Sequence, residues 1–254
     1  MNRRQKISLI RNNLKSGKPS IGSWMQIPNS SIAEIMGQSR FDWVAVDLEH
    51  GTIDVSQLPD LFRALELGNT LPLVRLAHGL PKDCKRALDA GAGGVIVPMV
   101  ESAEQLIRVR DACRWPPAGS RGVGFSRANL FGKYFEDYRA EAQEPLLVAM
   151  IEHIDAVESL ESILKVEGLD AILVGPYDLS ASMGITAKFE EQIFSEAMTK
   201  IRVLSKKFGI PFGMHVVAPQ HELVEEKIKE GYQFIAYSID AVFMSSVCQN
   251  PIID

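Results

Sequence analysis

The stretch VAVDLEH, residues 44–50, joins a buried strand to a group of titratable side chains. Its apolar run over residues 44–47 predicts a strand buried on both faces, which is typical of a parallel sheet covered by helices on both sides. Asp47, Glu49 and His50 stand at the end of that strand, and Gly51 follows them. The apolar run therefore indicates the class of fold, and the titratable residues at its end indicate a candidate site for chemistry.

Similar short apolar runs recur along the chain and alternate with longer amphipathic segments. The predicted strands cover residues 21–27, 43–49, 71–77, 93–100, 146–153, 169–175, 211–217 and 232–240. The predicted helices cover residues 31–39, 55–68, 80–91, 102–115, 156–166, 189–209 and 219–231, with 241–247 as an eighth. Several of these helices end in glycine after a polar or basic last turn, as expected of a C-cap.

Eight strand–helix pairs in 254 residues match a (β/α)8 TIM barrel in count and length. A doubly wound open sheet is the alternative. Because no linker or composition shift divides the chain, we expect one barrel domain over residues 1–254. The irregular stretch at about 116–145 is long for a loop, and its arginines and aromatic residues favour a lid or an oligomer contact over disorder.

The composition excludes several classes of function. The chain is 46% hydrophobic with a net charge of −5, so it offers no basic surface for nucleic acid or an anionic membrane. Its three cysteines lack metal-ligand spacing, which predicts reduced thiols in a cytoplasm. The basic N-terminus lacks the apolar core of a signal peptide, and no apolar run is long enough to span a membrane. We therefore expect a soluble cytoplasmic protein.

Chemically useful residues stand at the ends of several predicted strands, where the active site of a (β/α)8 barrel is found. A charged residue at one strand end is more often a solvated loop or cap residue; Asp178 could cap a helical turn, and His215 could be a hydrogen-bonded wall residue. Their joint occurrence at several strand ends favours a single site. The residues are Asp47, Glu49, His50, Arg75, Glu152, His153, Asp178 and His215.

The residue types at these ends favour a metal-dependent mechanism. None of the predicted strands contains a lysine, which a Schiff-base aldolase would carry there. Glu152 and Asp178, on neighbouring strand ends, suit a hard divalent ion such as Mg²⁺ or Mn²⁺. The glycine-rich phosphate loop expected after the last two strands is missing, which disfavours a phosphorylated substrate.

An ordered set of motifs resembles the HpcH/HpaI family of metal-dependent class II pyruvate aldolases, which includes 4-hydroxy-2-oxoheptanedioate aldolase and 2-dehydro-3-deoxyglucarate aldolase. The motifs are FDWVAVDLEHGTID, VRLA, DAGAGGVIVPMVESAEQ, GSRGVGFSRA, MIEH and VGPYDLSASMG, spread over about residues 20 to 240. The resemblance implies reversible cleavage of a 4-hydroxy-2-oxo acid to pyruvate and an aldehyde through a metal-bound pyruvate enolate. It also implies a homo-oligomer, a hexamer in this family, whose C-terminal helix packs on a partner subunit.

Carried over to this sequence, the resemblance assigns roles to single residues. Glu152 and Asp178 would bind the metal, which would be Mg²⁺ or Mn²⁺, with Co²⁺ and Zn²⁺ as further candidates. Arg75 would hold the enolate oxygen, and His50, oriented by Asp47, would be the base through a bound water. The other assignments are substrate binding by Gly175, Pro176, Tyr177 and His215, and a position beside a neighbouring subunit's pocket for Asp89.

The physical chemistry agrees with these roles, because breaking a bond beside a carbonyl requires a stabilised enolate, which a metal and an arginine can provide. A histidine is suited to moving the hydroxyl proton at neutral pH.

One position departs from the family, since Met150 stands where a glutamine is usual in the sugar-acid aldolases. The departure bears on a substrate or metal-water contact of that side chain and so on the exact substrate; the alternative is a methionine that fills a gap in the core. Three alternatives remain open. The chain could be a malyl- or citramalyl-CoA type thioester lyase, an oxaloacetate decarboxylase or carbon–carbon bond-forming synthase, or a non-catalytic barrel.

Overall fold

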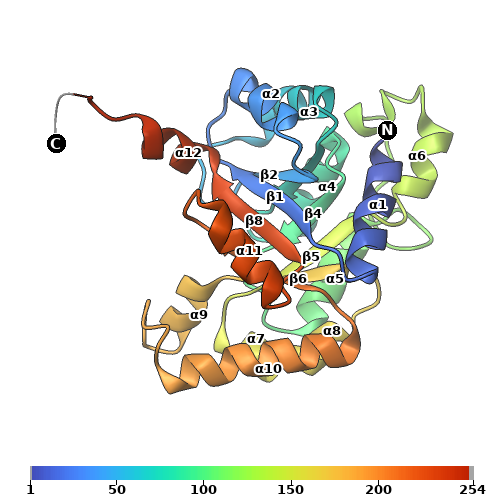
Figure 1. Ribbon diagram of the computed structural model, residues 1–254. Helices are drawn as coiled ribbons and strands as arrows, with labels where there is room; N and C mark the ends of the chain where they lie inside the picture. Colours follow the sequence, from blue (N-terminus) through green and yellow to red (C-terminus); the bar gives the residue numbers. More distant parts are fainter. Residues whose placement is uncertain (1, 252–254) are drawn as a thin grey trace.

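Eight short parallel strands close into a barrel in the computed structural model of the chain, which describes residues 2–251 (Figure 1). Each strand pairs with the next along the sequence, and β1 pairs with β8, so the sheet has no free edge. The strands are β1 (Ser20–Met25), β2 (Trp43–Asp47), β3 (Leu71–Arg75), β4 (Gly94–Val97), β5 (Leu146–Ile151), β6 (Ala171–Val174), β7 (Phe212–Val216) and β8 (Phe234–Ile239). The predicted barrel is confirmed, and the open doubly wound sheet is excluded.

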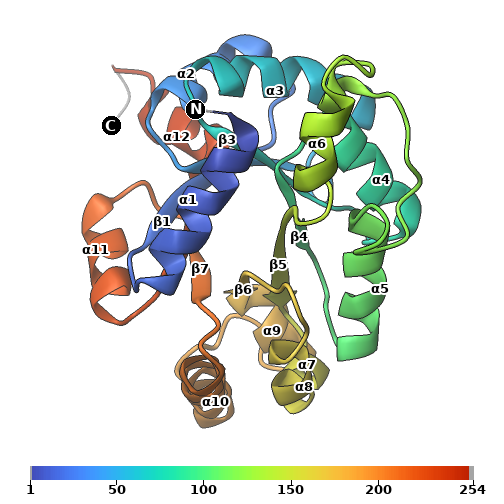
Figure 2. The same ribbon diagram turned by 90° about the vertical axis from the view of Figure 1, so that its right-hand side faces the viewer.

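Helices cover the outside of the barrel (Figures 1 and 2). They are α1 (Arg3–Lys15), α2 (Ser30–Gln38), α3 (Leu58–Leu67), α4 (Pro81–Ala90), α5 (Ala103–Cys113), α6 (Phe135–Glu141), α7 (Ile154–Glu158), α8 (Leu160–Leu164), α9 (Pro176–Ser182), α10 (Gln192–Phe208), α11 (His221–Lys229) and α12 (Asp240–Val247). Single 3₁₀ turns occupy Val55–Gln57 and Arg127–Asn129. The helix predicted over residues 156–166 is two short helices that meet at Ser159.

Helix α1 was not predicted, and it lies across the end of the barrel where the strands begin (Figure 2). Its buried residues Ile7, Ile10 and Leu14 belong to the same apolar cluster as Trp43 and Phe234 of the strands. Side chains three and four residues apart share one face of a helix, so these three residues present a continuous apolar stripe to the barrel. The helix thereby closes the interior at that end.

The barrel interior is filled by side chains rather than by solvent. The ring of Trp43 stacks on Phe234 with 4.4 Å between the centroids. A Cβ atom at Gly22 would lie 2.1 Å from the Trp43 ring, so this strand position requires glycine. The packed interior confines chemistry to the ends of the strands.

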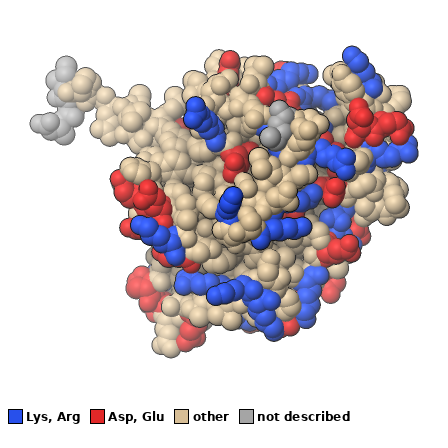
Figure 3. Space-filling view, turned by 45° about the vertical axis from the view of Figure 1, so that its right-hand side comes forward, with Lys and Arg blue, Asp and Glu red and all other residues tan. Residues whose placement is uncertain are grey.

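Helix α12 follows β8 and leads away from the barrel, on the side opposite to α1 (Figure 1). Two of its apolar side chains are exposed, Met244 by 51% and Val247 by 80%. On the face drawn in Figure 3, acidic and basic side chains are intermingled. Among residues 2–251, no helix is both long enough and apolar enough to cross a membrane.

Candidate active site

The barrel topology brings the predicted site residues to one end of the sheet. Asp47 and Arg75 are the last residues of β2 and β3, which pair with these two residues in register. Glu152 follows β5 directly, Asp178 lies in the first turn of α9 after β6, and His215 lies on β7. Because all strands run parallel, the ends of β2, β3, β5, β6 and β7 face the same side.

The centre of this site is a buried ion pair between Asp47 and Arg75. Arg75 donates from Nε to Oδ1 of Asp47 at 2.8 Å and from Nη2 to Oδ2 at 2.5 Å. Burial alone would raise the pKa of Asp47, but the hydrogen bonds and charge of Arg75 outweigh it and hold that pKa below its ordinary value. The guanidinium also lies over the Trp24 ring, 4.4 Å from its centroid. Two neighbours therefore fix the orientation of Arg75.

Asp47 binds the backbone of the following loop, not the imidazole that it was expected to orient. Its Oδ1 accepts the backbone N–H groups of Glu49 at 3.0 Å and of His50 at 3.2 Å. The His50 side chain is half-exposed, and its Nε2 lies 3.7 Å from Oε2 of Glu49. Asp47 thus holds the loop that carries His50, while Glu49 is the charged group beside the ring.

Glu152 is the most perturbed carboxyl group in the site. It is only 3% exposed, and its Oε2 accepts the backbone N–H of Met99 at 3.1 Å. Burial raises the pKa of Glu152 to about 7, against the Met99 hydrogen bond, and the charges of Glu49 and Asp178 raise it further. Three carboxyl groups therefore share one environment in which a cation would relieve their repulsion.

Glycine is required where α9 begins because Glu152 packs against it. A Cβ atom at Gly175 would lie 2.4 Å from Oε1 of Glu152 and 2.7 Å from its Cγ. Pro176 and Tyr177 then start α9, and the exposed Tyr177 ring meets Phe189 edge to face at 5.2 Å. The segment 175–177, predicted to bind substrate, thus begins beside the Glu152 carboxylate.

Glu49 links the ion pair to the carboxyl cluster. Its Oε2 lies 3.3 Å from Nη1 of Arg75 and is buried, and no hydrogen-bond partner for it occurs among residues 2–251. Burial raises the pKa of Glu49, as do the charges of Asp47 and Asp178, although Arg75 and His50 oppose the shift. A buried carboxylate oxygen that lacks a donor is costly, so this atom is available to a ligand.

His215 is a neutral wall residue at neutral pH. Burial lowers its pKa to about 4, and its Nε2 lies 3.3 Å from the carbonyl oxygen of Ser238. Its ring also meets Trp24 edge to face at 6.1 Å. Met150 is 4% exposed and belongs to the apolar interior of the barrel. Both residues therefore shape the pocket wall.

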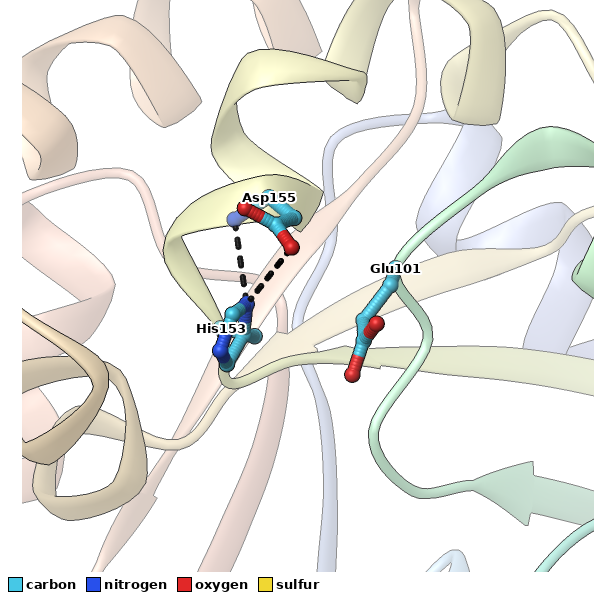
Figure 4. A group of neighbouring side chains, drawn as sticks. All are labelled: Glu101, His153 and Asp155. Carbon is cyan, nitrogen blue, oxygen red and sulfur yellow. Dashed lines mark hydrogen bonds and ion pairs between the residues drawn. The ribbon is translucent and has the colours of Figure 1, made fainter.

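Two residues that were predicted to take part in the site, Asp89 and His153, have charged neighbours outside the cluster of Arg75, Glu49 and Glu152. Asp89 lies on α4, where Arg121 is 3.9 Å from it and Lys85 is a further charged neighbour. His153 gathers with Glu101 and Asp155, and their ligand atoms lie within 4.8 Å of one another (Figure 4). The Nδ1 atom of His153, however, accepts the Asp155 backbone N–H at 3.2 Å, so His153 caps α7.

Sequence reasoning missed two groups that hold the site together. Gln26, just after β1, donates from Nε2 to Oδ2 of Asp47 at 2.8 Å. Its polar side chain at the end of an apolar strand could have indicated a place in the site. The Met99 backbone N–H, with Met99 at a φ of 47°, carried no such signal, because a side-chain pattern does not reveal a left-handed backbone.

Known proteins resemble this chain along nearly its whole length. The sequence pattern of the HpcH/HpaI aldolase/citrate lyase family matches residues 20–246. A hydroxypyruvate/pyruvate aldolase of Roseobacter denitrificans is 34% identical over 243 residues, which are 94% of this chain and 93% of the relative. A 2-keto-3-deoxy-L-rhamnonate aldolase of Salmonella gallinarum is 34% identical over 236 residues, 90% and 86% of the two chains. A crystal structure of an HpcH/HpaI aldolase/citrate lyase family protein from Burkholderia cenocepacia superposes with a TM-score of 0.87 at 28% identity, covering 94% of this chain and 95% of that chain.

Proposed function

Because the chain belongs to the HpcH/HpaI aldolase/citrate lyase family and is an aldolase, we propose that it reversibly cleaves a 4-hydroxy-2-oxo acid to pyruvate and an aldehyde. The relatives are named for hydroxypyruvate, pyruvate and a 2-keto-3-deoxy acid, which are all small 2-oxo acids. The observation that carries the proposal is the buried Arg75, fixed by Asp47 beside a cluster of carboxyl groups.

Glu152 and Asp178 would hold a divalent cation in this site. They fit such an ion, because Glu152 is buried beside the charges of Glu49 and Asp178, and Oε2 of Glu49 is a buried oxygen without a hydrogen-bond donor among residues 2–251. Oxygen ligands suit Mg²⁺ or Mn²⁺, and Co²⁺ or Zn²⁺ would also accept carboxylates. When bound, the cation would draw electrons from the keto group and weaken the neighbouring carbon–carbon bond.

Arg75 would stabilise the negative charge that develops on the keto oxygen. Asp47 occupies its Nε and Nη2 atoms, which leaves Nη1 as the donor closest to Glu49. A charge fixed in advance needs no reorganisation when the enolate forms, which is why such groups accelerate reactions. The Trp24 ring under the guanidinium restricts its motion further.

His50 would be the base. In cleavage it takes the proton of the substrate hydroxyl, the carbon–carbon bond beside that hydroxyl breaks, and its electron pair becomes the enolate. The aldehyde leaves, and a proton returned to the terminal carbon of the enolate completes pyruvate. The half-exposed ring lies beside Glu49, with its Nε2 atom 3.7 Å from Oε2 of that residue.

We also propose a homo-oligomer, a hexamer as the resemblance implies. The exposed apolar side chains of α12 would pack on a partner subunit, and Asp89 would lie near a neighbouring pocket. The supporting observation is that α12 leads away from its own barrel with Met244 and Val247 exposed (Figure 1).

Condensation of pyruvate with a panel of aldehydes tests the proposed reaction. The protein is incubated with pyruvate, Mg²⁺ or Mn²⁺ and each aldehyde, semialdehydes included, and the 4-hydroxy-2-oxo acid is measured by mass spectrometry. We expect product with at least one aldehyde, and none with Arg75→Ala or Asp178→Ala. Absence of product across the panel, together with cleavage of malyl- or citramalyl-CoA, would replace the proposal by a thioester lyase.

A further inference from the structure

We propose that Gln26 is a positioning residue that keeps Arg75 paired with Asp47 instead of Glu49. Gln26 contacts Asp47 but belongs to neither the ion pair nor the carboxyl cluster. The inference rests on the proposed function, since it concerns the charge that stabilises the enolate oxygen.

Gln26 and Arg75 share one oxygen of Asp47. Nε2 of Gln26 donates to Oδ2 at 2.8 Å, and Nη2 of Arg75 donates to the same atom at 2.5 Å. The other oxygen, Oδ1, accepts from Arg75 Nε and from two backbone N–H groups. Among residues 2–251, Oδ2 accepts hydrogen bonds from Arg75 and Gln26 alone. The Gln26 amide therefore helps to fix the plane of the carboxylate.

The backbone that carries Gln26 is itself anchored by hydrogen bonds. The buried Asp240 accepts the N–H of Gln26 at 2.9 Å through Oδ1 and that of Ile27 at 2.9 Å through Oδ2. It also accepts the N–H of Ala241 at 2.8 Å, in the first turn of α12. The Gln26 side chain therefore reaches Asp47 from a segment that cannot easily shift, which is what a positioning group requires.

Arg75 has a second carboxylate, that of Glu49, as a competing partner. Oε2 of Glu49 lies 3.3 Å from Nη1 of Arg75 and is buried, and the described part of the chain supplies no hydrogen-bond donor to it. If the Asp47 carboxylate turned, the guanidinium could rotate toward Glu49 and gain a charged hydrogen bond there. The donor assigned to the keto oxygen would then move. Gln26 opposes that movement by holding the Asp47 carboxylate in the orientation in which both of its oxygens accept hydrogen bonds from Arg75.

The test replaces the amide and separates turnover from binding. Gln26→Leu removes the donor at similar volume, and Gln26→Asn keeps an amide that is too short to reach Asp47. For each we expect kcat of pyruvate release to fall about 10-fold, the usual effect of losing one hydrogen bond to a charged group, with KM changed less than about 2-fold because the effect lies in the transition state. The thermal midpoint should stay within a few degrees of wild type.

A matched control removes another glutamine. Gln143 precedes β5 at the amino end of the barrel and donates to the carbonyl oxygen of Pro116 at 3.0 Å. Gln143→Leu should leave kcat unchanged. If it lowers kcat as much as Gln26→Leu does, the effect is a general loss of packing and the inference is wrong.

A double-mutant cycle shows whether Gln26 acts through Asp47. In an Asp47→Asn background, Gln26→Leu should change kcat less than about 2-fold, because its acceptor has been altered. A persistent 10-fold loss there, or an unchanged kcat in both Gln26 variants while Arg75→Ala is inactive, would overturn the inference. If Arg75→Ala and Asp47→Asn both keep wild-type turnover, the proposed function itself fails.

Discussion

At the scale of single residues, two buried acids of the site have pKa values that their neighbours move in opposite directions. Asp47 meets the Arg75 guanidinium, and its pKa is held low despite burial. Glu152 meets other carboxyl groups, and burial raises its pKa to about 7. Asp47 is a carboxylate that fixes an arginine, and Glu152 gains most from a bound cation. Environments that push two pKa values apart are a mark of functional sites.

The Mn²⁺ affinity of the chelator-treated protein should depend on pH through Glu152. Below the pKa of about 7 a proton occupies the carboxylate and competes with the ion. The dissociation constant should therefore fall about tenfold per unit as the pH rises toward 7 and level off above 8. Titration calorimetry over this range measures it. Glu152→Gln should bind weakly with little pH dependence; an unchanged slope in that variant would assign the titration to another group.

The two reactions of a pyruvate enolate separate the role of His50 from that of Arg75. Aldol cleavage needs a proton moved at the hydroxyl, whereas decarboxylation of oxaloacetate reaches the same enolate by losing CO₂. His50→Ala should reduce aldol activity by roughly 10²–10⁴ while sparing much of any decarboxylation, because only the first reaction uses the base. Arg75→Ala should suppress both rates. Equal losses of the two activities in His50→Ala would make His50 a binding residue.

At the scale of elements, the strands were predictable because residues buried on both faces must be apolar throughout. The residues at their ends followed, since parallel strands bring Arg75, Glu152 and Asp178 to one side of the barrel. Helix α1 was missed because its basic residues mask a stripe of three apolar ones. The hydrogen bonds among the site residues depend on side-chain rotamers, which periodicity does not encode, so the role of Asp47 toward the His50 backbone was not foreseen.

The junction of β6 and α9 should tolerate no side chain at Gly175. In Gly175→Ala the new Cβ would meet Oε1 and Cγ of Glu152 and push the carboxylate from its place. We expect Mn²⁺ to bind at least about tenfold more weakly, as seen when groups that orient a ligand are lost, with a small change in thermal midpoint. Gly184→Ala is the control, since its added Cβ meets nothing within 4 Å although its φ of 74° carries some strain. Wild-type affinity in Gly175→Ala would remove Glu152 from the metal site.

At the scale of the whole molecule, the barrel is a closed sheet, but the last helix, α12, extends away from it. The sheet has no free edge, and α1 covers one end of the interior. Helix α12 instead leads outward from the end of β8, on the side of the site (Figure 1). Asp240 ties its first turn to the segment that carries Gln26, so the base of α12 is connected to the site.

Removing α12 should lower the oligomeric state. A chain that ends at Asp240 lacks the exposed apolar residues Met244 and Val247, which we expect to be buried against a partner. Light scattering of the truncated and full-length proteins at equal concentration measures the difference. A full-length protein that is monomeric at micromolar concentration would contradict the proposed assembly.

The most direct test of the account follows pyruvate release from a 4-hydroxy-2-oxo acid by chelator-treated protein during titration with Mn²⁺. Since the described strands carry no lysine that could form a Schiff base, we expect no turnover without the ion and a rate that rises in proportion to the fraction of metal sites occupied. Borohydride added with pyruvate should leave the protein unmodified. Full turnover in the chelator, or covalent trapping of pyruvate by borohydride, would contradict the metal-dependent mechanism.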